Sequence, residues 1–248
     1  MKDSAKLYAG QIKALILKHP ELFGDLGKTT VIFEKALPTH SVIADCLIFS
    51  SIQGVIGIEI KTDHDNTRRL NNQLKAYEEI CDRVYVLCHD NKVAEVTKVL
   101  KRYHHDSVGL MSYSTYQGEQ LTGIIRDVQI CPTFDPANIL RVLWKHELVA
   151  VANSLTSAGT LDFDLVQRKL NLDAATRSYG RISSGTINPI SQSMPKEQIV
   201  QYIVGILGLL GAHQLIVDMF INHTKHPDKV LHYYHFKPTP EVHYHLYT

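Results

Sequence analysis

The strongest constraint on the fold of this chain is a pair of apolar stretches, residues 41–50 and 54–61, which a short polar loop separates. Apolar runs joined by such a loop are typical of a β-hairpin. If the turn is centred on Ile52, antiparallel partners lie at equal distances from it along the chain. The predicted register pairs Phe49 with Val55, Leu47 with Gly57, and Asp45 with Glu59.

This register places two acids on neighbouring strands, with a lysine close by. Glu59 and Lys61 are two residues apart, so they share one face of the predicted strand, while the intervening isoleucines point to the other face and can be buried. Carboxylates side by side repel each other, and either a bound divalent cation or a raised pKa relieves the repulsion. Metal binding is the more economical interpretation, and a solvated acid pair on a strand edge is the alternative.

Residues 65–81 predict an amphipathic helix with Asp65 as its N-cap. Arg69, Gln73 and Tyr77 lie at helical spacing on one stripe, so they would look back at the hairpin. Tyr77 also fits the apolar face and could equally be a core residue. The apolar stripe of this helix consists of Leu70, Leu74, Tyr77 and Cys81.

These residues resemble the PD-(D/E)XK nuclease superfamily, whose pattern is an acid on one strand, an acid-x-Lys on the next and a helix with further active-site groups. Asp45 and Glu59-Ile-Lys61 match the first two parts, although Ala44 stands where the superfamily has Pro. Gln73-Leu-Lys-Ala-Tyr77 is similar to the Gln-x-x-x-Tyr motif of the RecB-like branch. The run from Glu59 onward is also similar to the EIK-x-D-x-D-x-x-x-R-L signature of a little-studied family of phages and bacteria.

The resemblance implies a restriction-endonuclease-like core and a Mg²⁺-dependent deoxyribonuclease that hydrolyses phosphodiester bonds. It implies that Asp45, Glu59 and the carbonyl of Ile60 would bind Mg²⁺ or Mn²⁺, hard cations that prefer oxygen ligands. Lys61 would orient the attacking water and offset charge in the transition state. Gln73 would position Lys61 or the scissile phosphate, with Tyr77 supporting it from the helix.

Three further features have less specific interpretations. Glu34 lies where related families place an additional acid ahead of the hairpin, which would make it a catalytic residue. Arg68 and Arg69 would bind substrate phosphates, and a solvated helix face is the alternative. Asp63-His64-Asp65 could suggest a second metal site, but a polar loop followed by a helix cap explains it more simply.

Composition sets the class of protein. The chain has 248 residues and a formal net charge of +1, which is ordinary globular material and argues against a surface that is basic throughout. A DNA-binding groove would therefore be local. Cys46, Cys81, Cys88 and Cys131 have no metal-binding spacing, so we expect reduced intracellular thiols. The family resemblance implies that the compartment is the cytoplasm of a bacterial cell and that the protein is encoded by the cell or by a phage.

Along the chain, the pattern predicts two domains. Helices at 3–19 and 91–103 and strands at 30–36, 83–88, 108–113 and 121–131 would complete a mixed β-sheet flanked by helices, giving an α/β nuclease-like domain over residues 1–133. Residues 134–248 predict a mostly α-helical accessory domain for substrate selection or oligomerisation. Asp135 would cap its first long helix, whose apolar stripe is Leu140, Leu143, Trp144 and Leu148.

A second long helix is predicted from Pro195 through Asp218. Its polar residues argue against a membrane span, and glycines three apart favour close helix packing or a homo-oligomer contact. The turn-rich stretch at 178–191 could touch substrate, and the histidines near the C-terminus could be zinc ligands, stack on bases or lie on the surface.

Taken together, these patterns predict a metal-dependent nuclease that acts on DNA and has no membrane partner. The alternative from another class is a catalytically silent module of the same fold that binds nucleic acid or a partner protein. The complete set of Asp45, Glu59 and Lys61 favours the enzyme.

Overall fold

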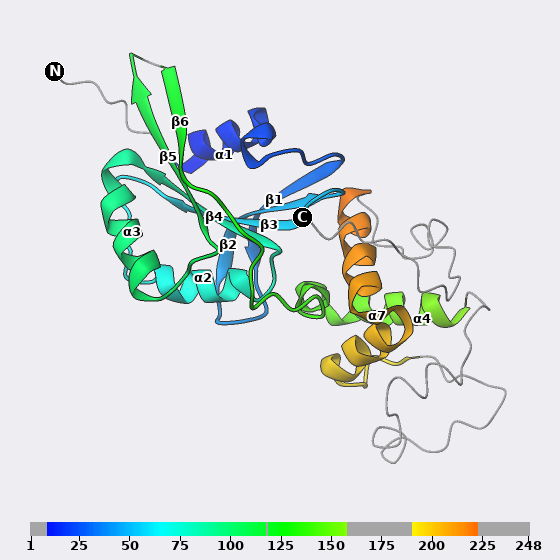
Figure 1. Ribbon diagram of the computed structural model, residues 1–248. Helices are drawn as coiled ribbons and strands as arrows, with labels where there is room; N and C mark the ends of the chain where they lie inside the picture. The colour runs from blue at the N-terminus through cyan, green and yellow to red at the C-terminus, as the bar shows by residue number, and fades with distance from the viewer. Residues whose placement is uncertain (1–8, 118, 158–189, 223–248) are drawn as a thin grey trace.

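The computed structural model describes residues 9–117, 119–157 and 190–222, and its core is a six-stranded sheet in the order β1-β2-β3-β4-β5-β6 (Figure 1). The strands are β1 (Thr29–Ala36), β2 (Ile43–Ser50), β3 (Gly54–Lys61), β4 (Arg83–His89), β5 (Gly109–Tyr116) and β6 (Glu119–Arg126). The helices are α1 (Ala9–Lys18), α2 (Leu70–Glu78), α3 (Val93–Arg102), α4 (Lys145–Ser157) and α7 (Lys196–Ile221), with short 3-10 helices η1 (Pro20–Phe23), η2 (Asp90–Lys92) and η3 (Asn138–Val142).

The sheet is mixed, as the sequence predicts. β1, β2 and β3 are antiparallel neighbours, β3, β4 and β5 are parallel, and β6 returns antiparallel to β5. The parallel pairs need crossover connections, and α2 and α3 supply them. The α/β class is therefore confirmed.

Two of the three predicted hairpin pairs are confirmed. Leu47 lies opposite Gly57 and Phe49 opposite Val55, around a turn at residues 51–53. The ladder ends at Cys46 and Ile58, one step before the position where Asp45 and Glu59 would meet. The two acids thus lie at the open end of the hairpin, where the backbone pairing has stopped.

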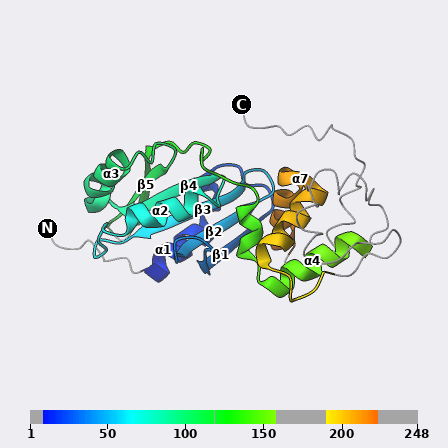
Figure 2. The ribbon, with the colours of Figure 1, turned by 90° about the horizontal axis from the view of Figure 1, so that it is seen from below.

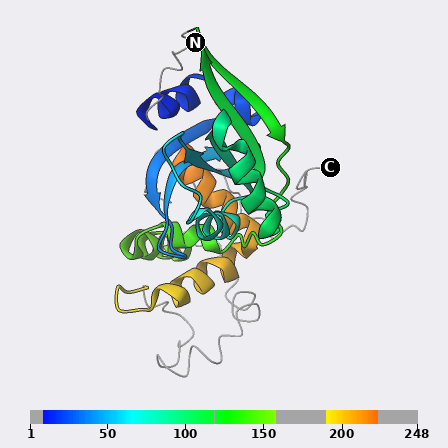
Figure 3. The same cartoon turned by 90° about the vertical axis from the view of Figure 1, so that its left-hand side faces the viewer.

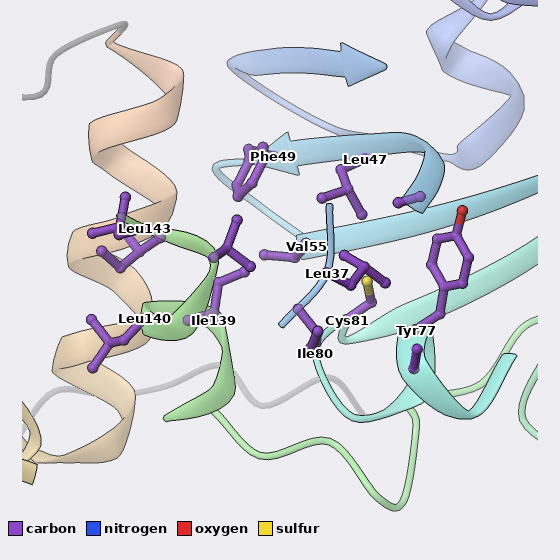
Figure 4. Packing of buried hydrophobic residues seen from close by; sticks show 14 of the residues in the cluster. Leu37, Leu47, Phe49, Val55, Tyr77, Ile80, Cys81, Ile139, Leu140 and Leu143 are labelled. Atoms are coloured by element: carbon purple, nitrogen blue, oxygen red, sulfur yellow. The ribbon is translucent and has the colours of Figure 1, made fainter. Parts of the chain in front are cut away.

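The two faces of the sheet are covered by different helices (Figure 3). Ile56, Ile58 and Ile60 pack with Ile12 and Ile16 of α1. Leu47, Phe49 and Val55 belong to the larger core on the opposite face, together with residues of α2 and α7 (Figure 4). The alternation of β3 is confirmed, and Glu59 and Lys61 share the face that α2 covers.

Two predicted elements differ from the structure. The helix after the hairpin begins at Leu70, and the carboxylate of Asp65 instead accepts hydrogen bonds from the backbone N–H and the hydroxyl of Thr62, each at 2.7 Å. The predicted helix after Asp135 is divided into η3 and α4, because Leu143 is extended (φ −73°, ψ 149°) and α4 starts anew behind Trp144. Trp144 is exposed instead of lying on an apolar stripe.

The described C-terminal segment is helical, as predicted, and α4 and α7 gather at one end of the sheet (Figures 1 and 2). α7 contacts β1, β2 and β3, and the ring of Phe220 stacks on Phe49 at a centroid distance of 4.1 Å. α7 bends at Gly208, whose backbone is not helical (φ 72°, ψ 168°). By length and composition, α7 could also cross a membrane.

Several expectations remain predictions. The division into domains at residues 133–134 is one of them, although the larger core includes side chains from both sides of that boundary. The stretch at 178–189 and the histidine-rich tail after residue 222 lie outside the described residues.

Candidate functional site

Three elements bring the predicted site residues together: the start of β2, the end of β3 and the first turns of α2. The Lys61 ammonium lies 2.5 Å from Oε1 of Glu59 and 3.1 Å from Oε1 of Gln73. Both Glu59 and Lys61 are buried, whereas Asp45 and Gln73 are half-buried. Asp45, Glu59, Lys61 and Gln73 thus form one polar cluster, although they come from different parts of the sequence.

Beyond the last ladder pair of β2 and β3, the Asp45 side chain makes the next contact between the two strands. Its Oδ2 accepts a hydrogen bond from the backbone N–H of Ile60 at 2.9 Å. In an extended strand the N–H and C=O of one residue point to the same side. The carbonyl of Ile60 therefore faces β2 beyond the last ladder pair, on the side where Asp45 lies.

Tyr77 holds this open end of the hairpin from α2. Its hydroxyl accepts a hydrogen bond from the backbone N–H of Asp45 at 2.8 Å and donates one to the carbonyl of Ile58 at 3.2 Å. The ring is fully buried, and its hydroxyl end points from α2 toward the strands (Figure 4). A Cβ on Gly57 would lie 2.3 Å from Cδ1 of Tyr77, so only glycine leaves room for the ring.

Burial raises the pKa of both carboxyl groups. Burial, with a further contribution from the Asp45 charge, raises the pKa of Glu59 to about 7, and Lys61 offsets part of that effect. Burial also raises the pKa of Asp45, against the hydrogen bond from Ile60 and the charge of Lys61. Two acids with raised pKa values beside an ammonium are typical of a functional site.

One oxygen in the cluster lacks a hydrogen bond. Oε2 of Glu59 is buried and has no hydrogen-bond partner among the described residues. An unsatisfied buried carboxylate oxygen is costly, and a cation is a natural partner for it. Asp45, Glu59 and the Ile60 carbonyl offer the kind of oxygen atoms that could hold a hard divalent cation. Within the described residues, no group of three or more His, Cys, Asp or Glu side chains is arranged so that it could hold a metal ion.

Other predicted site residues lie apart from this cluster. Glu34 is exposed on β1, and its carboxylate forms an ion pair with Lys13 of α1. Arg68 and Arg69 are exposed where α2 begins, close in sequence to Gln73. The polar loop at 63–65 is closed by hydrogen bonds from Thr62 to Asp65. The expected loop is present, but Asp65 does not cap α2.

Sequence reasoning missed the part that Gly57 plays. A glycine inside a buried apolar strand is a recognised sign of close approach by another group, and that signal is present in the sequence. The identity of the approaching group, the Tyr77 ring, depends on how α2 docks and could not be read from the pattern.

Comparison with known proteins shows the family. Residues 2–190 match the family described as bacteriophage P4 protein cII, and because this match spans most of the chain, the chain belongs to that family. Protein cII of Enterobacteria phage P4 is 26% identical over 144 residues, which are 58% of this chain and 52% of the relative. The chain thus spans about half the length of the curated relative that it matches.

Among solved structures, the chain is similar to a protein of unknown function from Silicibacter pomeroyi. The TM-score is 0.34 at 14% sequence identity, over 74% of this chain and 99% of the other.

Proposed function

We propose that this protein is a metal-dependent nuclease of the PD-(D/E)XK type that hydrolyses phosphodiester bonds of DNA. The observation that carries the proposal is the buried Glu59 oxygen without a hydrogen bond, beside Asp45 and an ammonium held at 2.5 Å. The family membership is compatible with a phage-related protein, and the cytoplasm of a bacterial cell is the compartment that we propose for it.

Asp45, Glu59 and the Ile60 carbonyl would hold Mg²⁺ or Mn²⁺. Such an ion, when bound, polarises a phosphoryl oxygen and lowers the pKa of water. The buried position of Glu59 excludes bulk water from one side of the site. In this environment of low dielectric constant, the electrostatic interactions between charges are stronger than they would be at the surface.

Lys61 and Gln73 act on the substrate side. Gln73 accepts a hydrogen bond from the Lys61 ammonium, and this contact fixes the direction of the lysine side chain. An ammonium so placed orients the attacking water and stabilises negative charge as it develops on the phosphate oxygens. Tyr77 keeps the Asp45 backbone in place through its hydroxyl and takes no proton from substrate.

Arg68 and Arg69 would contact the phosphates of the DNA next to the cleaved one. Both are exposed at the start of α2, a helix with no acidic residue in its first turn. Arginines placed in this way contribute affinity without reading sequence.

The test is cleavage by the purified full chain of supercoiled plasmid, single-stranded DNA and RNA, with Mg²⁺, Mn²⁺ or EDTA. We expect cleavage of DNA that requires the metal and is lost in Lys61→Ala and in Asp45→Asn. Asp45→Asn is the sharper variant, because an amide can still accept the Ile60 N–H and the change removes repulsion from Glu59. Its unfolding temperature should not fall.

Lys75→Ala is the matched control, since Lys75 is an exposed lysine of the same helix. It should cleave like the unaltered protein. Equal cleavage by Asp45→Asn would reveal a contaminating nuclease. Metal-independent DNA binding by a stable, inactive protein would favour the silent module instead.

A further inference from the structure

Glu34 is the cross-strand neighbour of Asp45 by register. On β1 and β2, Phe33 pairs with Cys46 and Lys35 pairs with Ala44, so the position between them would pair Glu34 with Asp45. Extending the β2–β3 register by one step pairs Asp45 with Glu59. Directly opposite residues share a face of the sheet. With extended backbone throughout, the three acids would form one row across three strands.

The structure breaks this row at a single residue. Glu34 has a left-handed backbone with φ 56°, and its pair with Asp45 is missing from an otherwise continuous ladder. A glutamate rarely adopts this conformation without a compensating contact.

The compensating contact comes from the other side of the sheet. The Glu34 carboxylate binds the ammonium of Lys13, which also lies 5.4 Å above the ring of Phe33. Phe33 packs with the core beneath α1, on the face opposite Glu59. Lys13 therefore holds Glu34 away from the face where the other two acids lie.

The broken pair also frees a backbone group of Asp45. Its N–H donates to the Tyr77 hydroxyl at 2.8 Å, so the absence of the β1 contact leaves no buried donor unsatisfied. The arrangement is complete without the Glu34–Asp45 pair, and two local states of Glu34 are compatible with the same fold.

An independent observation indicates which kind of ligand this row of acids would bind. Glu59, which has no exposed surface, has one oxygen without a hydrogen bond at the end of that row. A hard divalent cation prefers several carboxylate oxygens, and the Asp45–Glu59 pair supplies only two side chains.

We propose that Glu34 is a switchable third carboxylate ligand, which the Lys13 ion pair holds out of the metal site and which turns in when that pair opens. This inference rests on the proposed metal site and adds a control point to it. Anything that draws Lys13 away, such as a phosphate of bound nucleic acid, would release Glu34. Metal affinity and substrate binding would then be coupled through α1.

The first test is calorimetric titration of the metal-free full chain with Mn²⁺. Lys13→Met should bind Mn²⁺ more tightly, on the order of tenfold, because it releases an additional charged ligand. Adding Glu34→Gln to Lys13→Met should remove the gain. Lys18→Met removes another lysine of α1, one that is exposed, and should leave the affinity unchanged.

The second test observes the backbone of Glu34 directly. In Lys13→Met, Mg²⁺ should move the ¹³Cα and ¹³Cβ shifts of Glu34 from left-handed toward extended values. His104, another residue with left-handed backbone (φ 59°), should not move.

The outcomes separate this inference from the proposed function. If Mn²⁺ binding is lost in Asp45→Asn but the gain in Lys13→Met survives Glu34→Gln, the ammonium acts only through its charge and the switch is wrong. Unchanged Glu34 shifts at saturating Mg²⁺ would also overturn it. No metal binding by any form of the protein would overturn both the switch and the proposed metal site.

Discussion

Glu59 is the central residue of the proposed metal site. It lies in a strand whose only other charged residue is Lys61, and it has no exposed surface. Lys61 neutralises one of its oxygens and leaves the other without a hydrogen bond. A buried acid in this state is a cost to the fold, which natural proteins tolerate mainly where function requires it.

The raised pKa of Glu59 makes stability depend on pH. Between pH 4.5 and about 7 the unfolded chain has lost the Glu59 proton while the native state retains it, so the free energy of unfolding falls as the pH rises through this window. A shift from 4.5 to about 7 corresponds to roughly 3 kcal/mol at most. Denaturant unfolding at several pH values should show this fall in the metal-free protein.

Glu59→Gln is the comparison that isolates the effect, since all other titrating groups are common to both proteins. The stability of the variant relative to the unaltered protein should increase as the pH rises from 4.5 to 7. A constant difference across that range would contradict the assignment.

For single residues, the alternation of a strand and the register of the hairpin about its turn were enough to predict much of the site. Asp45, Glu59 and Lys61 converge because a strand alternates faces and a hairpin pairs residues equidistant from its turn. Glu34 could not be placed in the same way. Its direction depends on a left-handed φ and on a lysine 21 positions earlier, and no local pattern encodes either.

Among the elements, α2 determines the shape of the site because it lies directly against β3. It contributes Gln73 to the lysine and Tyr77 to the open end of the hairpin. The sequence predicted this helix and its stripe from spacing alone. It did not predict the start at Leu70, because the Thr62–Asp65 turn competes for the acid that would otherwise cap the helix.

The close contact between α2 and β3 can be tested at Gly57. Gly57→Ala should push the Tyr77 ring away, since the new Cβ would lie 2.3 Å from Cδ1, and should destabilise the protein by about 1–3 kcal/mol. The rate of metal-dependent cleavage should fall by more than the loss of folded protein accounts for, because the Asp45 backbone N–H loses the Tyr77 hydroxyl as its partner. Thermal unfolding and cleavage rates would be measured side by side.

Gly123→Ala provides a matched control in the same sheet. The nearest atom to its new Cβ is Oγ of Ser112 at 3.7 Å, which is ordinary contact. If Gly123→Ala and Gly57→Ala behaved alike, the glycine at position 57 would not be required for the docking of α2.

For the whole molecule, the question is how the C-terminal helices are joined to the sheet. One hydrophobic core runs from Leu47 and Phe49 through Ile139 and Leu143 to α7 (Figure 4). Within it, the buried carboxylate of Asp82 accepts hydrogen bonds from the N–H of Val55 at 2.7 Å and from Nε2 of His213 at 3.0 Å. A single side chain thus ties α7 to the first residues of β3. Composition and periodicity gave no sign of this contact, which joins residues 131 positions apart.

The Asp82–His213 contact leads to a prediction about the molecule as a unit. His213→Ala leaves a buried carboxylate with one donor fewer, and a hydrogen bond to a charged group contributes about 1.5–3 kcal/mol. The exposed pair of His40 and Glu79 is the comparison, and His40→Ala should cost less than about 1 kcal/mol.

Because Asp82 sits at the turn end of the hairpin and Asp45 at the open end, His213→Ala should lower the unfolding temperature in a single transition while cleavage well below that temperature persists. Two separate transitions would mean that the helices unfold independently of the sheet. Loss of cleavage in a fully folded variant would show that α7 acts on the site through β3.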